Sequence, residues 1–183
     1  MKIYTRKGDD GTTGLLWGGR ITKSSARPAA YGTVDEAQAF LGVARAGCER
    51  GGELDRIIIR IEHDLWVLMA ELATAPGNRH KLTPGKNLVT AEMVSALEVL
   101  IDDVTERFEQ PKEFVVPGQD LVAARLDVAR TVVRRAERDA LAIDDDPATQ
   151  AIPYLNRLSD LCWTLARWRE ADVAGGSLAS RAT

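Results

Sequence analysis

The stretch that decides the fold is Phe114–Arg138, F-V-V-P-G-Q-D-L-V-A-A-R-L-D-V-A-R-T-V-V-R-R-A-E-R. A short apolar run ends at Pro117-Gly118, and a long pattern with the period of an α-helix follows it. Counted at about 100° per residue, one face of this helix is apolar and is expected to be buried. That face holds Val122, Leu126, Ala129, Val133, Ala136 and Ala140. The stretch therefore predicts a buried helix that packs closely against other helices.

A second face of the same helix carries Arg130, Arg134 and Glu137, at positions i, i+4 and i+7. A carboxylate three residues after a guanidinium can pair with it and hold it still. Two interpretations stay open on these residues alone. The face is a solvated surface with salt bridges, as most charge runs are, or it is a rigid set of arginines directed at the phosphates of a nucleotide.

Length and composition narrow the class of protein. A chain of 183 residues with 45% apolar and 28% charged residues is typical of one soluble globular domain. The net charge of -3 argues against a general nucleic-acid binder. Cys48 and Cys162 form no C-x-x-C motif, which favours a reducing compartment. With no apolar run of about 18 residues and no apolar secretion signal, we expect a cytoplasmic protein without a membrane partner.

Apolar residues spaced three and four apart predict five helices and no strand alternation. The helices run from about Pro28 to Gly47, from Glu53 to Ala73, from Thr90 to Phe108, from Gly118 to Ile143, and through Ile152–Trp168. Asp144–Pro147 is expected to end the fourth helix before the fifth begins. The extended segment Phe114–Pro117 is too short to form a sheet. We predict an all-α, ferritin-like five-helix bundle in a single domain over 1–183. The bundle would occupy 28–173, preceded by an arm over 1–27 and followed by a frayed tail over 174–183.

The arm combines glycines, hydroxyls and basic side chains without a helical period. Gly8 and Gly11 let backbone N–H groups approach a ligand closely, and Arg6 and Lys23 supply positive charge. The arm is not a Walker A loop, because no Lys-Ser/Thr pair follows its last glycine. A phosphate-binding loop and a merely flexible N-terminal arm are both compatible with this composition.

The sequence lacks the motifs of metal-dependent and covalent catalysis. His63 and His80 have no Glu-x-x-His spacing, so a di-iron bundle is unsupported, and the two isolated cysteines argue against zinc. The chain also lacks a G-x-S-x-G motif. We therefore expect no metal held by protein side chains and no covalent nucleophile. Such a site suits a reaction in which the protein orients two bound molecules and stabilises a leaving polyphosphate.

Three segments together resemble one family. They are Thr5–Leu15 (T-R-K-G-D-D-G-T-T-G-L), continuing through Arg20–Lys23 to Ala30–Glu36; Phe114–Gly118 with Ala129–Arg138; and Pro153–Leu161 (P-Y-L-N-R-L-S-D-L). In this order they resemble the PduO-type corrinoid adenosyltransferases, which transfer the 5′-deoxyadenosyl group of ATP to cob(I)alamin. The likeness covers nearly the whole chain, including the order of the five helices.

The resemblance implies a homotrimer with active sites between subunits, and it implies roles for individual residues. Residues that would wrap the ATP phosphates are Thr5, Arg6, Gly8, Asp9, Gly11, Thr12, Thr13 and Lys23. Arg134, Glu137 and Asn156 would contact the nucleotide, and Arg130 would form an ion pair with Asp35 across the subunit interface. Phe114 would close the lower face of the corrin ring.

The resemblance also implies ATP with magnesium on its phosphates and cob(I)alamin as the second substrate. It brings a monovalent cation, and a corrinoid reductase or a cobalamin-dependent enzyme, into consideration as further partners.

Four segments or single residues depart from the family pattern near the expected corrin side: Glu36-Ala37-Gln38, Gln119-Asp120, Asp127 and Trp163. The departures at Gln119, Asp120 and Asp127 support a second hypothesis, an escort or sensor protein that binds ATP or adenosylcobalamin with little turnover. A third hypothesis is a helical scaffold without a ligand.

Overall fold

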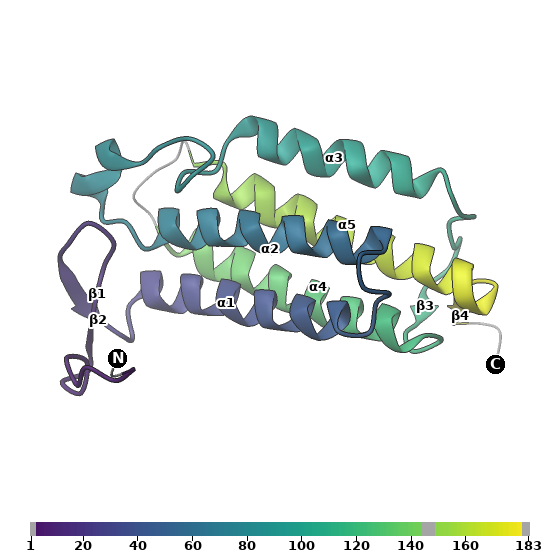
Figure 1. Ribbon diagram of the computed structural model, residues 1–183, viewed down its shortest axis with the longest axis horizontal. Helices are drawn as coiled ribbons and strands as arrows, with labels where there is room; N and C mark the ends of the chain where they lie inside the picture. The colour runs from purple at the N-terminus through teal and green to yellow at the C-terminus, as the bar shows by residue number, and fades with distance from the viewer. Residues whose placement is uncertain (1–2, 144–148, 181–183) are drawn as a thin grey trace.

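Five α-helices make up most of the structure, a computed structural model that describes residues 3–143 and 149–180 (Figure 1). They are α1 (Ala26–Arg45), α2 (Glu53–Leu72), α3 (Ala91–Thr105), α4 (Leu121–Leu141) and α5 (Ala151–Ala174), and a short 3₁₀ helix, η1 (Pro76–Lys81), lies between α2 and α3. The predicted all-α bundle is confirmed. No helix of the described residues has both the length and the apolar content that a bilayer crossing needs.

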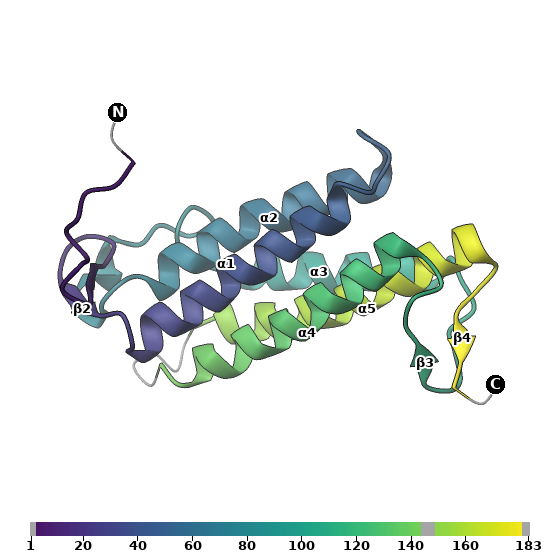
Figure 2. The ribbon, with the colours of Figure 1, turned by 90° about the horizontal axis from the view of Figure 1, so that it is seen from below.

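The helix α4 lies at the centre of the packing, between α1 and α5, while α2 packs mainly on α1 and α3 mainly on α5 (Figures 1 and 2). The apolar face predicted for α4 is buried as expected. Alanines recur along the contact, with Ala30, Ala37 and Ala44 of α1 fully buried. Small side chains on facing helices let the two backbones approach closely, which suits the packing of α1 on α4.

Two helices begin at polar capping residues. Thr90 caps α3 by accepting a hydrogen bond from Met93 N at 3.3 Å. Asp120 caps α4, where its Oδ1 accepts from the amides of Val122 and Ala123 at 2.9 and 3.0 Å. This aspartate, which departs from the family pattern, therefore has a structural role at the start of α4.

The structure adds two short strand pairs that the sequence pattern does not predict. In the arm, β1 (Thr12–Gly14) pairs antiparallel with β2 (Arg20–Thr22), because Gly18 and Gly19 adopt φ of +102° and +91° and turn the chain back. At the other end of the chain, β3 (Val115–Val116) pairs antiparallel with β4 (Leu178–Ala179). Each pair is only two or three residues long, too short for an alternating pattern.

The frayed tail expected over 174–183 is also corrected where the structure describes it. The helix α5 continues to Ala174 and ends at Gly175, whose φ of +74° closes the helix as Gly176 N donates to Glu170 O at 3.1 Å. The tail then forms β4. Residues 181–183, like the stop signal at Asp144–Pro147, lie outside the described residues.

Helix boundaries differ from the expected ones by a few residues. The helix α1 begins at Ala26, two residues before Pro28, since a proline is tolerated in the first helical turn. Phe108 lies beyond the end of α3 but still packs against the core.

Candidate functional site

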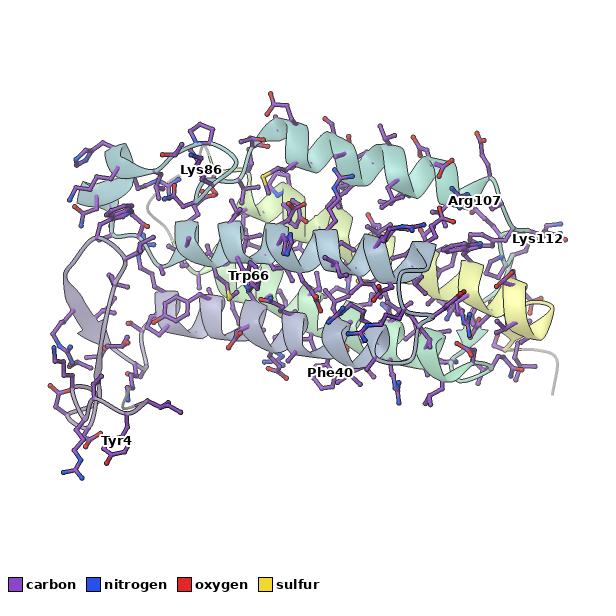
Figure 3. All side chains as sticks on the ribbon, in the orientation of Figure 1. Tyr4, Phe40, Trp66, Lys86, Arg107 and Lys112 are labelled. Carbon is purple, nitrogen blue, oxygen red and sulfur yellow. The ribbon has the colours of Figure 1, made fainter. Side chains whose placement is uncertain are left out.

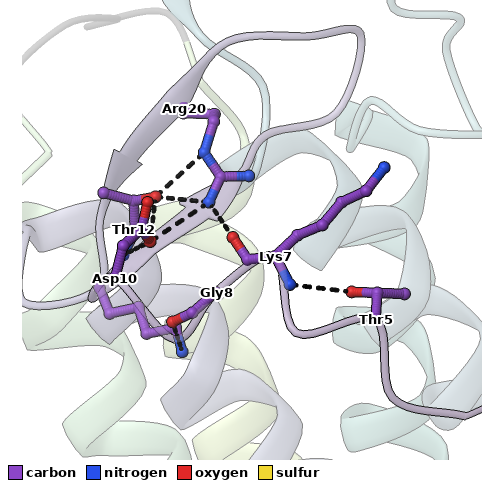
Figure 4. A network of polar contacts seen from close by, with 7 residues as sticks. Thr5, Lys7, Gly8, Asp10, Thr12 and Arg20 are labelled. Carbon is purple, nitrogen blue, oxygen red and sulfur yellow. Dashed lines mark hydrogen bonds and ion pairs between the residues drawn. The ribbon is translucent and has the colours of Figure 1, made fainter.

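The arm is an ordered loop built around Arg20 (Figure 4). The Arg20 guanidinium donates to Thr12 Oγ1 from Nε at 3.0 Å and from Nη2 at 2.5 Å, and Nη2 also donates to Lys7 O at 2.5 Å. Asp10 Oδ1 accepts from both the hydroxyl and the amide of Thr12, at 2.7 and 2.9 Å. These hydrogen bonds, together with the charge of Arg20, hold the pKa of the Asp10 carboxyl below its usual value. The arm therefore has a defined shape before any ligand is bound.

Gly8 sits at the closest approach inside the arm. Lys23 Nζ donates to Gly8 O at 2.8 Å, and Lys23 N donates to Gly11 O at 2.9 Å. A Cβ on residue 8 would lie 3.1 Å from Lys23 Nζ and 3.2 Å from Thr12 O. Only glycine fits there without displacing the lysine. The interpretation of a shaped loop is thus better supported than that of a flexible arm.

The arm is attached to the bundle at the C-terminal end of α2. Leu16 N donates to Ala73 O at 2.9 Å, and Asn78 Nδ2 of η1 donates to Trp17 O at 3.4 Å. Figures 1 and 2 show the arm at the end of the bundle where α1 begins, α4 ends and α5 begins. The arm and the last turns of α4 thus belong to the same end of the molecule.

The face of α4 predicted to bind a nucleotide meets the start of α5. Glu137 Oε1 accepts from Asn156 Nδ2 at 3.0 Å, and Asn156 Oδ1 accepts from Arg157 Nη1 at 2.5 Å. Arg157 Nε in turn pairs with Glu98 Oε1 of α3 at 2.8 Å. Arg134 is exposed on α4, and its guanidinium is not part of this chain of contacts. Glu137 is thus held by an amide from another helix instead of an arginine on its own helix.

Arg130 has a different partner from the one expected. Its Nε lies 3.5 Å from Asp127 Oδ1 within the same helix, while Asp35 is exposed on α1. The Arg130 Nε is buried without a hydrogen bond of good geometry among the described residues. Since the structure is that of a single chain, the ion pair between Arg130 and Asp35 across an interface stays a prediction.

Asp127, a departure from the family pattern, belongs to a buried charge cluster. Its Oδ2 lies 2.6 Å from Arg167 Nη2, and Arg167 Nε lies 3.1 Å from Glu170 Oε2. The Arg167 side chain is 2% exposed and that of Glu170 is 0% exposed. The guanidinium of Arg167 also lies over the ring of Trp163, 5.9 Å from its centroid. Asp127 and Trp163 therefore form one cluster with Arg167.

Phe114 does not lie near the arm. Its side chain is 88% exposed, in the segment that precedes β3. That segment lies at the opposite end of the bundle from the arm, as the positions of Tyr4 and Lys112 show in Figure 3. The helix α4 between the two ends has 21 residues and is about 30 Å long at about 1.5 Å per residue. One chain thus keeps the predicted nucleotide residues and the predicted corrin residue apart.

Two residues that shape this region have no specific role in the sequence analysis. Arg20 organises the arm, and the Trp17-Gly18-Gly19 turn could have signalled the hairpin that brings it to Thr12. Glu71, 0% exposed, accepts from Val89 N at 2.8 Å, Arg79 Nη2 at 3.0 Å and Thr149 Oγ1 at 2.5 Å. It ties the end of α2, where the arm is attached, to η1 and to the start of α5.

The part of the chain that the structure describes contains no cluster of side chains that could bind a metal ion. No three histidine, cysteine, aspartate or glutamate side chains gather there as ligands. Asp9 and Asp10 are the carboxylates of the arm, and Asp10 is already engaged by Thr12 and Arg20.

Comparison with known proteins adds to the geometry. The sequence profile of the family described as cobalamin adenosyltransferase matches residues 3–169. The chain is 43% identical over 171 residues to the corrinoid adenosyltransferase of Citrobacter freundii, covering 92% of this chain and 95% of that protein. It is 39% identical over 173 residues to that of Bacillus subtilis, covering 91% and 86% of the two chains.

The fold has solved counterparts as well. A variant of the PduO-type ATP:corrinoid adenosyltransferase from Lactobacillus reuteri, complexed with cobalamin and ATP, superposes with a TM-score of 0.88 at 28% identity. The match covers 98% of this chain and 97% of that one. Profile, relatives and fold agree over nearly the whole length, and the chain therefore belongs to the cobalamin adenosyltransferase family, of the PduO type.

Proposed function

We propose that the chain transfers the 5′-deoxyadenosyl group of ATP to the Co(I) centre of a corrinoid, giving an adenosylated corrinoid and triphosphate. The observation that carries the proposal is the arm, folded at the same bundle end as the Glu137–Asn156 pair. It is supported by membership of the family and by a relative that was solved with both cobalamin and ATP.

The reaction requires no covalent bond between the protein and either substrate. Co(I) attacks the 5′ carbon of the ribose, the C5′–O bond breaks, and its electron pair leaves with the triphosphate. The protein has to hold the two molecules in line and stabilise the charge on the leaving group. The amides, hydroxyls and cations of the arm suit the triphosphate. These are Thr5, Arg6, Gly8, Asp9, Gly11, Thr12, Thr13 and Lys23, with magnesium carried on the phosphates.

Arg134 is the residue of α4 that we assign to the leaving group. It is exposed, and its position three residues before Glu137 places both on the face that meets Asn156. Glu137 and Asn156 hold each other through a hydrogen bond of 3.0 Å, so either can present its remaining oxygen or N–H to the nucleoside. We assign these two residues to recognition of the nucleotide.

Phe114 is assigned to the corrinoid. An exposed aromatic ring offers an apolar surface but no lone pair that could serve as a lower axial ligand to cobalt. Covering the lower face with such a ring excludes water and leaves the cobalt without that ligand, which eases its reduction to Co(I). The corrinoid is a substrate in this scheme, and its cobalt is part of that substrate.

The family resemblance implies a homotrimer with sites between subunits, and the separation of the two ends supports sites that are shared between copies. The arm and Phe114 of one chain lie at opposite ends of the bundle, so a site that uses both takes them from different copies. The predicted ion pair between Arg130 and Asp35 would lie across the same interface. Free Cys48 and Cys162 favour a cytoplasmic location for such an assembly.

The escort or sensor hypothesis loses its main support. It rested on departures from the family pattern, and two of them have structural roles, Asp120 as the cap of α4 and Asp127 as the partner of Arg167. We therefore favour the enzyme.

An anaerobic assay tests the proposal. The protein is mixed with Mg-ATP and chemically reduced cobalamin or cobinamide, and a light-sensitive Co–C product together with triphosphate is expected. Omitting ATP is the control and should give no product. If the protein binds Mg-ATP, as a thermal shift would show, but forms no product, the escort hypothesis takes the place of the enzyme.

A further inference from the structure

The C-terminal strand is bonded directly to the segment that carries Phe114. Ser180 N donates to Phe114 O at 2.8 Å, and Val115 and Val116 pair with Ala179 and Leu178 in the antiparallel register of β3 and β4 (Figure 2). These contacts join residues that are more than 60 positions apart in the sequence. The segment before α4 and the end of the chain thus form one small unit.

The ring of Phe114 is not held by packing. With 88% of the residue exposed, the side chain lies outside the hydrophobic core. The ring position is then set by the backbone of residue 114, which belongs to the long connection between α3 and α4. Ordering a backbone residue costs about 1–2 kcal/mol of conformational free energy. The strand pair and the Ser180 hydrogen bond are the contacts that offset this cost at Phe114.

The strand β4 is in turn anchored to the bundle. Ser177 Oγ donates to Glu170 Oε2 at 2.5 Å, and Gly176 N donates to Glu170 O at 3.1 Å. Glu170 is fully buried and pairs with Arg167, which pairs with Asp127 of α4. The tail is therefore attached to a buried charge cluster inside the bundle.

The other end of the same connection is also attached to α5. Arg169 Nε lies 3.2 Å from Asp120 Oδ1, the cap of α4. Arg169 and Glu170 are neighbours in sequence, so the last turns of α5 hold the connection on both sides of Phe114. The position of the ring is thus determined by the C-terminal part of the chain.

We infer that residues 175–180 are a positioning element for the corrinoid, with the amide of Ser180 and the side chains of Ser177 and Glu170 holding Phe114 where it covers the ring. This inference rests on the proposed function. It assigns a role in the reaction to a segment that lies beyond the matched profile, which ends at residue 169.

The sharpest variant is Ser180→Pro, with Ser180→Ala as its matched control. Proline has no N–H, so it removes the hydrogen bond to Phe114 O, and it restricts the residue before it to the extended region that Ala179 already occupies in β4. Alanine keeps the amide and removes only an exposed hydroxyl. Residue 180 lies outside the helices, so both variants are expected to keep the thermal unfolding midpoint of the parent.

We expect Ser180→Pro to raise the Kd for cob(II)alamin in the presence of Mg-ATP by about 5-fold, which is about 1 kcal/mol, the value of one hydrogen bond. The absorption and electron paramagnetic resonance spectra of bound cob(II)alamin should show a smaller four-coordinate fraction. The KM for ATP should stay at the parental value, and Ser180→Ala should match the parent in every measurement. A Ser180→Pro protein with parental Kd and spectrum overturns the inference, and so does one whose ATP and corrinoid constants change together.

A double-mutant cycle tests whether the strand acts through the ring. If it does, Ser180→Pro adds nothing to Phe114→Ala, whereas independent roles make the two effects additive. Additive effects contradict the inference. Failure of the proposed function is a distinct result, because the parent protein itself would then form no adenosylated product.

Discussion

Asp127 and Arg167 form a pair in which Oδ2 of the carboxylate lies 2.6 Å from Nη2 of the guanidinium, inside the bundle and between α4 and α5. The other oxygen of the same carboxylate lies 3.5 Å from Arg130 Nε. One buried carboxylate therefore serves two arginines, one in the structural cluster and one on the predicted nucleotide face.

Removing the charge of Asp127 should destabilise the fold. In Asp127→Asn the buried guanidinium of Arg167 keeps only Glu170 as an ionised partner, and breaking a buried pair costs about 3 kcal/mol. The free energy of unfolding from urea titration measures the loss. Asp103→Asn is the control, since its pair with Arg107 is on the surface and contributes about 1 kcal/mol at most. Equal losses in the two variants would contradict the assignment of a buried cluster.

Replacing Arg134 should affect catalysis without affecting stability. The residue is exposed on α4, so Arg134→Ala should unfold at the parental urea concentration while kcat/KM falls at least about 10-fold, or about 1.4 kcal/mol of transition-state stabilisation. Arg60→Ala, an exposed arginine on α2, is the matched control and should retain parental kinetics. Parental kcat and KM for ATP in Arg134→Ala would show that its assigned role is wrong.

Crowding the arm should weaken ATP binding. In Gly8→Ala the new Cβ would lie 3.1 Å from Lys23 Nζ and 3.2 Å from Thr12 O, so the lysine has to shift by a few tenths of an ångström and its hydrogen bond to Gly8 O is strained. We expect the KM for ATP to rise by up to about 5-fold, which is the value of that hydrogen bond if it is fully lost, with the corrinoid Kd unchanged. The control is Gly77→Ala in η1, where a Cβ meets nothing within 4 Å and φ is not positive. Similar ATP constants for the two variants would show that Lys23 has no role in binding.

The half-buried Asp64 gives the free energy of unfolding a pH dependence of defined sign. Partial burial raises the pKa of the Asp64 carboxyl above its ordinary value of 3.8, although the hydrogen bond from Tyr154 Oη at 2.9 Å and the charges of Arg60 and His63 oppose that rise. A raised pKa in the folded state adds stability that is fully present below pH 3.8 and lost as the pH rises through the folded value.

Asp64→Asn should therefore gain stability relative to the parent as the pH rises. Asparagine can still accept the hydrogen bond from Tyr154 Oη, but it has no carboxyl group whose ionisation the folded state disfavours. Urea midpoints of both proteins at a series of pH values from about 3.5 to 7 measure the difference. A difference that stays constant over this range would mean that Asp64 titrates alike in the folded and unfolded chain.

The parts of the structure that could be predicted from the sequence are those with a local period. Val122 to Ala140 repeat at helical spacing, and the helix they predict is α4. The hairpin at Thr12–Thr22 and the pair between Val115 and Ala179 could not be found in this way, because strands of two or three residues carry no alternation.

The same limit applies to the site. The arm and the Glu137–Asn156 segment were identified from their motifs, but the contacts that hold them were not. Asp127 and Arg167 are 40 positions apart, and nothing near Asp127 signals an arginine on another helix. The sequence indicates only that Asp127 departs from the family pattern, and the structure adds its pair with Arg167.

The placement of the arm and Phe114 at opposite ends of one bundle has a genetic consequence. Under the proposed function each chain supplies half of each of two sites, so a defect in the arm and a defect at Phe114 would disable different halves. Two impaired proteins, one with substitutions in the arm and one with Phe114→Ala, would then regain activity when their subunits are exchanged, because some interfaces join two intact halves.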